Sequence, residues 1–514
     1  MTGTGPLVQV SAGLLRGLEV GGVRVFRAVP YARAPVGPLR FRPPVECEPW
    51  DGVRDATTFG AIAPQFPTPL ETLQGRMDLP QSEDCLTLNI WAPPGTQAAA
   101  RPVMVWIHGG AYVNGTGASD WFDGTSFAAN HGIVLVTINY RLNVFGYLHL
   151  AGIADGEEGA GNCGLLDQIA ALRWVRDNIA AFGGDPGTVT VFGESAGAMS
   201  VGVILGTPAA TGLFQRAILQ SGAAVNVTSA QDATAVARDI LVELGLSTDE
   251  DGIAELRQLP TDRILAAYGA VGQRRFSSAA PEELAMLSAP VVDGVVLPQE
   301  PMTAIREGAS ADVAVIIGTD LDEMEVMRLQ DESFYRFGDD EVIRRFTKIF
   351  GARVDEALAL YRSLPGPTTR NLWTAVDTDR VFLAPAIALA EAHGAAGGST
   401  WLYLFTWTTT AFGGHLGALH TLEIPFVFNT LDRGPSPELT GGPPAEARML
   451  AERLHRTWAE FARKGDPNHD AIPPWPVYEP QRRATMILDT DCVVEDDAQR
   501  DRRMLWADLA APAG

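Results

Sequence analysis

Residues 188–200 hold the pattern that most constrains this chain: a short β-branched run, TVTVF, then Gly-Glu-Ser-Ala-Gly, then small residues that predict a helix. A tight turn from strand to helix strains its central residue, and glycine on either side avoids collision with the crossing backbone. The central residue is Ser195, whose hydroxyl would stand at a helix N-terminus, where free N–H groups favour negative charge. The pattern predicts Ser195 as a nucleophile, although these five residues alone also fit an ordinary glycine-rich turn.

The chain around this turn alternates between predicted strands and helices. The expected strands are 7–29 with a hairpin at 21–22, then 86–91, 103–107, 133–138, 188–192, 216–220, 313–317, 401–406 and 486–488. A helix is expected over 165–179, where apolar residues recur at helical spacing. This order predicts a doubly wound α/β fold with a large, mostly parallel central sheet flanked by helices. We expect one domain over 1–514, with helical insertions at about 230–306 and 325–398 above the C-terminal edge of the sheet.

Composition limits the partners and the location. The chain has 514 residues, 46% of them hydrophobic, and a formal charge of −23, which argues against nucleic acid or an anionic membrane as a partner. No stretch approaches the roughly 18 consecutive apolar residues that span a bilayer, so we expect a soluble protein. The first ten residues carry no visible secretory signal, which favours a cytoplasmic location, although a processed precursor would look the same.

The four cysteines are Cys47, Cys85, Cys163 and Cys492. They are widely scattered and show no CxxC or other metal-ligand spacing. We therefore expect buried free thiols, and neither a metal nor an organic cofactor.

A serine nucleophile needs donors for the oxyanion that forms during acyl transfer. The run His-Gly-Gly-Ala-Tyr at 108–112 directly follows a predicted buried strand, and its small residues let adjacent amides point the same way. We assign the backbone N–H groups of Gly110, Ala111 and Ala196 as the donors, the last because it follows the nucleophile.

The base is expected to be a histidine, which can take and return a proton near neutral pH. The chain order Ser, acid, His excludes the three histidines that precede the serine. His420 is favoured because it lies in a loop after a predicted strand, and His415 is its nearest rival. The acid is open at this point, because the run 318–325 contains four carboxylates, Asp320, Asp322, Glu323 and Glu325.

Further motifs give the chain a family resemblance. They are 25–32 (VFRAVPYA), 39–41 (LRF), 82–86 (SEDCL), 161–168 (GNCGLLDQ), the turn at Ser195 and 465–468 (GDPN). In combination they resemble the type-B carboxylesterases, the cholinesterase-like branch of the α/β-hydrolases, and within these the bacterial para-nitrobenzyl esterases. The resemblance implies an α/β-hydrolase fold, with Ser195 as nucleophile, Glu323 as acid and His420 as base. It also implies the same oxyanion donors.

Two departures from the family pattern bear on location and substrate. Secreted members pair the cysteine equivalent to Cys85 with one that precedes Pro-Gln, but here that position is Ala63, which favours a reducing compartment. No tryptophan lies between Pro64 and Asp84, where cholinesterases hold a quaternary ammonium by cation–π attraction. Choline esters are therefore not the expected substrates.

We accordingly expect a serine esterase that hydrolyses small-molecule carboxylic esters through an acyl-enzyme. The same triad could instead act on amides, carbamates or bulky natural-product esters, and the sequence does not separate these substrates. A non-catalytic binding protein of the same family is the other alternative. Such proteins typically lack the nucleophile, whereas all three triad positions are filled here.

Overall fold

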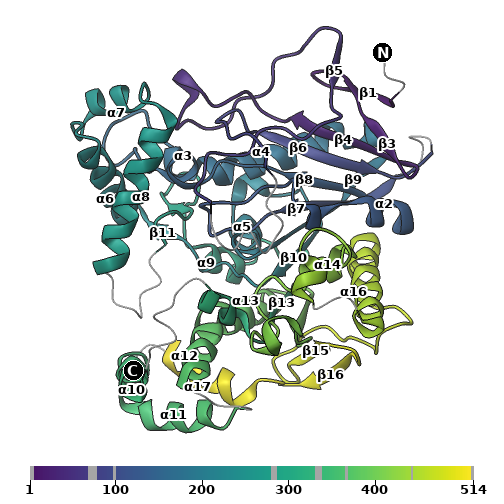
Figure 1. The fold of residues 1–514 in the computed structure, drawn as a ribbon, viewed down its shortest axis with the longest axis vertical. Coiled ribbons are helices and arrows are strands. Elements are labelled where there is room, and N and C mark those ends of the chain that lie inside the picture. Colours follow the sequence, from purple (N-terminus) through teal and green to yellow (C-terminus); the bar gives the residue numbers. More distant parts are fainter. Residues whose placement is uncertain are drawn as a thin grey trace.

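The computed structural model describes residues 5–67, 78–95, 100–278, 286–329, 338–364, 369–440 and 444–510. In this part of the chain, eleven strands form one sheet in the order β16-β15-β14-β13-β10-β9-β7-β8-β6-β4-β3, which crosses the molecule in Figure 1. The strands are β3 (Leu18–Val20), β4 (Val23–Pro30), β6 (Thr87–Ala92), β7 (Arg101–Ile107), β8 (Val134–Ile138), β9 (Gly184–Glu194), β10 (Arg216–Gln220), β13 (Ala314–Asp320), β14 (Thr400–Phe405), β15 (Ala484–Leu488) and β16 (Val493–Asp496).

Neighbouring strands from β8 through to β15 are parallel, and the flanking pairs are antiparallel. The parallel strands are buried on both faces, as predicted from the apolar run at 103–107. Val103 and Val105 of β7 pack on one side, with helices α4 (Cys163–Asn178) and α5 (Ala196–Leu205). Trp106 points to the other side, towards α14 (Ile424–Phe428) and α16 (Ala445–Lys464). Helices therefore cover both faces, as the doubly wound pattern predicted.

The predicted hairpin at 21–22 is confirmed. Val20 of β3 pairs with Val23 of β4, and the two residues between them, Gly21 and Gly22, have φ angles of 58° and 87°. A two-residue hairpin needs positive φ at these positions, which glycine adopts without strain. The preceding strands β1 (Leu7–Val10) and β2 (Gly13–Arg16) join β5 (Val53–Asp55) in a separate small sheet.

Most other predicted strands are confirmed, with shifted ends. Strand β13 was expected to end at Ile317 but runs on to Asp320, because residues 318–320 continue the parallel pairing with β14. Strand β16 was missed, since its side chains are mostly exposed and the segment has no apolar alternation. Within the described residues, no helix is both long and apolar enough to cross a membrane.

The remaining helices occupy both segments that we interpreted as insertions. The first contains α6 (Ala230–Glu243), α7 (Glu250–Leu256), α8 (Thr261–Ser278) and α9 (Pro301–Arg306), and the second α10 (Asp339–Phe350), α11 (Val354–Arg362), α12 (Thr369–Thr378) and α13 (Ala384–Ala395). In Figure 1, α6 to α8 stand together beside the sheet, and α10 to α12 gather with the C-terminal α17 (Arg500–Ala510). The interpretation of the chain as one domain with these insertions stays a prediction.

Shorter elements complete the described fold. They are α2 (Thr125–His131), α3 (Asn143–Tyr147), α15 (Ser436–Leu439), β11 (Thr228–Ser229) and β12 (Val291–Val292).

The four cysteines are free thiols, as expected, but only Cys85 and Cys163 are fully buried.

Candidate active site

Ser195 lies at the corner between β9 and α5, with φ 52° and ψ −125°. A Cβ atom added to Gly193 would lie 2.6 Å from the carbonyl carbon of Gly197, and one added to Gly197 would lie 2.0 Å from the carbonyl oxygen of Ile107. Only glycine fits at both positions, so the predicted reason for the Gly-x-Ser-x-Gly pattern is confirmed. The flanking residues of β9 and α5 are buried, whereas Ser195 itself is half-buried.

The loop at 108–112 packs directly against this corner. A Cβ on Gly109 would lie 3.1 Å from Cβ of Ser195. The loop backbone therefore lies so close to the serine that a side chain at position 109 would be crowded. Gly110, Ala111 and Tyr112 all have positive φ, at 111°, 53° and 61°. Three consecutive residues of the loop thus have positive φ beside the corner that carries Ser195. The N–H of Ala196 is the first of α5 and has no intrahelical acceptor.

His108 anchors the loop. Its carbonyl accepts a hydrogen bond from the Tyr140 hydroxyl at 2.9 Å, and its ring stacks on Tyr140 with centroids 4.5 Å apart. Burial lowers the pKa of His108 to about 4, so its ring is neutral at physiological pH. His108 therefore holds the loop in place, in agreement with its exclusion as the base.

His420 and Glu323 are brought together. Nδ1 of His420 lies 2.5 Å from Oε2 of Glu323, and both side chains are buried. The other Glu323 oxygen accepts the backbone N–H of Asp320 at 2.9 Å, which fixes the carboxylate. His415, the rival base, is exposed.

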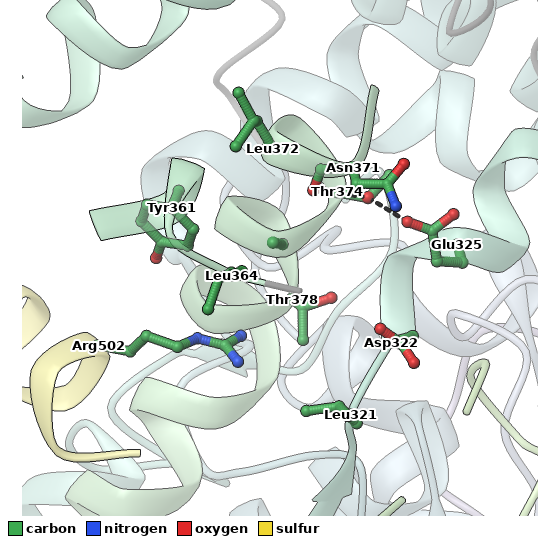
Figure 2. Close-up of a pocket in the computed structure, with 11 residues that line it drawn as sticks. Leu321, Asp322, Glu325, Tyr361, Leu364, Asn371, Leu372, Thr374, Thr378 and Arg502 are labelled. Atoms are coloured by element: carbon green, nitrogen blue, oxygen red, sulfur yellow. Dashed lines mark hydrogen bonds between the residues drawn. The ribbon is translucent and has the colours of Figure 1, made fainter. Parts of the chain in front are cut away.

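The turns that carry Glu323 and His420 are joined by backbone hydrogen bonds. The N–H of Asp322 donates to the carbonyl of Ala418 at 3.0 Å, and the Ala418 N–H donates to Oδ2 of Asp322 at 2.9 Å. The N–H of His420 also points to the carbonyl of Glu323, at 3.4 Å. Asp322 is thus a structural link between the two turns, and Glu325 is turned away to accept a hydrogen bond from the Thr374 hydroxyl (Figure 2).

A second carboxylate, which the sequence analysis missed, lies at the other ring nitrogen. Nε2 of His420 is 3.1 Å from Oε1 of Glu194, the residue before Ser195. Among the described residues, no hydrogen bond joins the Ser195 hydroxyl to His420. Burial by itself would lower the pKa of His420, but the charges of Glu194 and Glu323 raise it. Burial raises the pKa of Glu194 as well.

Comparison with known proteins identifies the chain. The model of the carboxylesterase family matches residues 4–506. The protein belongs to the carboxylesterase family. It is 38% identical to the para-nitrobenzyl esterase of Bacillus subtilis (strain 168) over 506 residues, which cover 97% of this chain and 98% of the relative. It is 35% identical to a phenmedipham hydrolase of Pseudarthrobacter oxydans, with 94% and 95% covered.

Solved structures agree with the sequence comparison. The crystal structure of the Geobacillus stearothermophilus carboxylesterase EST55 superimposes with a TM-score of 0.86 at 40% identity and covers 97% of this chain and 99% of its own. The predicted α/β-hydrolase fold and the family resemblance are both confirmed. This carboxylesterase is a carboxylic ester hydrolase.

The carboxylesterase has a cavity of about 760 Å³ beside the loop that follows β7. Ala111 is among its lining residues, and half of the lining comes from the C-terminal part of α8. The lining residues are Phe66, Ala111, Val113, Asn114, Asn143, Val236, Tyr268, Gly269, Gly272, Gln273, Arg275, Phe276, Ser277, Ser278, Met286 and Leu287. The one charged member of this set, Arg275, is paired with Asp239 through two hydrogen bonds. The wall is therefore mainly apolar and suits uncharged substrate groups.

A smaller cavity of about 280 Å³ lies behind the acid-bearing turn (Figure 2). It is bounded by Asp322 and Glu325 from that turn, by residues of α11 and α12, and by Arg502 of α17. Arg502 forms a buried ion pair with Asp379. Ser195 lines neither cavity, but only the larger of the two is lined by a residue of the 108–112 loop, Ala111.

Proposed function

We propose that this carboxylesterase cleaves esters through an acyl-enzyme carried on Ser195, with His420 as general base and Glu323 as its orienting acid. The observation that carries the proposal is the 2.5 Å contact between His420 Nδ1 and Glu323 Oε2. A proton on Nδ1 held by Glu323 leaves Nε2 of the neutral ring unprotonated. Nε2 can then accept the Ser195 proton.

Acylation follows from this arrangement. Ser195 Oγ attacks the ester carbonyl while Nε2 of His420 takes its proton, and negative charge develops on the carbonyl oxygen. The N–H groups of Gly110, Ala111 and Ala196 donate hydrogen bonds to that oxygen. The imidazolium then returns its proton to the departing alcohol, and the acyl group stays on Ser195.

Deacylation repeats the same steps with water as the nucleophile. His420 takes a proton from water, the oxyanion forms again, and the carboxylic acid leaves. The imidazolium is present in both halves of the reaction. Glu323 and Glu194 stabilise it from its two nitrogens, and the 3.1 Å separation of Glu194 from Nε2 supports this role.

The test is a substrate screen with p-nitrophenyl esters of graded acyl length, an amide, a carbamate and phenmedipham. Phenmedipham is included because one relative is named for its hydrolysis. We expect burst kinetics with a p-nitrophenyl ester, since acylation releases p-nitrophenol before deacylation. An organophosphate should label Ser195 once, as read by mass spectrometry. Labelling at another residue would refute the assignment of the nucleophile.

The alternative substrates share this machinery. Amides, carbamates and bulky esters would use the same triad, and the mainly apolar 760 Å³ cavity leaves room for a bulky uncharged group. The screen decides between these substrate classes by their values of kcat/KM.

The cytoplasmic location stays a prediction, which fractionation of the source cells would test.

A further inference from the structure

Two carboxyl groups face each other behind the His420–Glu323 pair. Asp320 ends β13 and Glu423 directly precedes α14, and both are fully buried. Their side chains lie close enough to act directly on each other's ionisation. Both oxygens of Asp320 and Oε2 of Glu423 receive no hydrogen bond from any N–H or O–H group in the described part of the chain.

Two ionised carboxylates do not remain in contact without a donor, because their charges repel in a buried site and each oxygen needs a hydrogen bond. The other groups that act on the pair make double ionisation still less favourable. Glu194 at the end of β9 and Glu323 after β13 are acidic, and Tyr403 of β14 is a buried phenol. The charge of His420 acts in the opposite sense and favours an ionised Glu423. One proton shared by the pair removes the repulsion and supplies the missing hydrogen bond.

The hydrogen bonds of Glu423 indicate which carboxyl carries that proton. Oε1 of Glu423 accepts the side-chain N–H of Gln220 at 2.9 Å. The Gln220 amide cannot be reversed, because its oxygen accepts the Trp458 indole N–H at 3.0 Å and an indole nitrogen only donates. Glu423 thus has a fixed donor that favours its ionised form, whereas the Asp320 carboxyl has none. Burial also raises the pKa of Asp320 well above its usual range.

We propose that Asp320 is a carboxylic acid that keeps its proton and donates a hydrogen bond to Glu423, and so holds Glu423 as a carboxylate behind His420. The charge of Glu423 favours the imidazolium form of His420. Asp320 is therefore a positioning residue, which acts on the base through Glu423. This effect on catalysis rests on the proposed function, but the location of the proton does not.

The proton is located by infrared difference spectroscopy of the carboxylic acid C=O stretch. We expect Asp320→Asn to lose one buried-acid band that the wild type shows. The control is Asp312→Asn, which changes an exposed aspartate just before the same strand and should keep the band. Glu423→Gln should shift the band, because the acid then has a different acceptor. Retention of the band in Asp320→Asn would place the proton elsewhere and overturn the proposal.

Stability against pH gives a second readout that does not depend on activity. A carboxyl whose pKa is raised by folding stabilises the native state fully below its ordinary pKa, and this stabilisation is lost as pH rises towards the folded pKa. Asparagine lacks this dependence. The Tm of Asp320→Asn minus that of the wild type should therefore grow as pH rises from about 5 to about 9. A difference that stays constant over this range would contradict a neutral Asp320.

Kinetics tests the positioning role. Asp320→Asn keeps a neutral donor of the same shape, so it should retain the acid limb of the kcat/KM profile. Asp320→Leu removes the donor, so Glu423 takes up a proton, the imidazolium loses support and the acid limb moves to lower pH. We expect a loss of about tenfold in kcat/KM for Asp320→Leu, the effect of one hydrogen bond to a charged group. A folded Asp320→Leu variant with an unchanged pH profile of kcat/KM would refute the positioning role.

The two proposals can fail separately. If Ser195 were not the nucleophile, the infrared and stability results for Asp320 would be unaffected.

Discussion

The serine side of the site is built from backbone, whereas the histidine side is built from buried side chains. Ser195 and the loop at 108–112 are held by glycines that no other residue could replace and by positive φ angles in consecutive residues. His420 is held by Glu323 and Glu194, two carboxylates from different strand ends. On the serine side, steric restriction of the backbone sets the directions of the N–H groups. On the histidine side, the charges of the two carboxylates set the protonation of His420. The two sides should therefore respond differently to substitution.

The largest effect is expected for Ser195→Ala, which removes the nucleophile and leaves the oxyanion donors intact. We expect kcat to fall by about 10⁴ to 10⁶ with Tm unchanged. Ser221→Ala is the matched control, because Ser221 also has positive φ and a buried hydroxyl, at the end of the next strand. A Ser195→Ala variant that kept a tenth of wild-type esterase activity would end the proposed mechanism.

On the histidine side, Glu323→Gln should lower kcat by about 10⁴, because the amide stabilises the wrong tautomer and leaves the imidazolium without its charge. Asp322→Asn and Glu325→Gln should have mild effects. Both residues accept hydrogen bonds away from the His420 ring, and an amide oxygen can accept the same bonds. If Asp322→Asn were inactive and Glu323→Gln active, the assignment of the acid would be wrong by one residue.

On the backbone side, Gly197→Ala should act through folding. The added Cβ lies 2.0 Å from the Ile107 carbonyl oxygen, and we expect a loss of about 3 kcal/mol in the free energy of unfolding, with activity lost through the displaced turn. Gly394→Ala is the control. It also adds a methyl group to a helix, but its nearest contact is 3.9 Å away. Equal Tm values for the two variants, measured by thermal unfolding, would show that the turn tolerates a side chain.

Glu194→Gln should change the pH profile more than the fold. Activity needs neutral His420, so kcat/KM rises with pH through the pKa of that residue. The Glu194 charge raises this pKa, and its removal should move the acid limb to lower pH. We also expect kcat/KM at its maximum to fall by about 10- to 100-fold, because the imidazolium loses one charged partner. An unmoved acid limb would contradict the role of Glu194.

The smallest effect is expected for Phe276→Ala in the cavity wall. Phe276 is 73% exposed, so Tm should not change. KM for a hexanoyl ester should rise by about two- to fivefold relative to an acetyl ester, as for the loss of a small apolar contact. An equal rise for both esters would show that Phe276 does not contact the longer acyl chain.

The same contrast explains what could be predicted from the sequence. The Ser195 turn and the close approach of the 108–112 loop were predicted from local patterns, because small residues at fixed offsets have a direct steric cause. His420 lies 97 residues from Glu323, and only the family resemblance singled out that carboxylate among four in one turn. Glu194 and Glu423 were missed because nothing near them in the chain shows what they face. Asp320 was considered only as a rival acid, since its strand was expected to end earlier.

The backbone hydrogen bonds between residues 322–323 and 418–420 have a consequence for protein engineering. Because the acid-bearing and base-bearing turns are joined at Asp322 and Ala418, we expect that they must be transferred together, although they are distant in the chain. A graft that carried only the histidine turn into another scaffold would leave these bonds unmade. Insertions that reshape the larger cavity can enter at α8, which makes no such bond to either turn among the described residues. Evolution can thus vary the cavity wall while the acid and base stay in register.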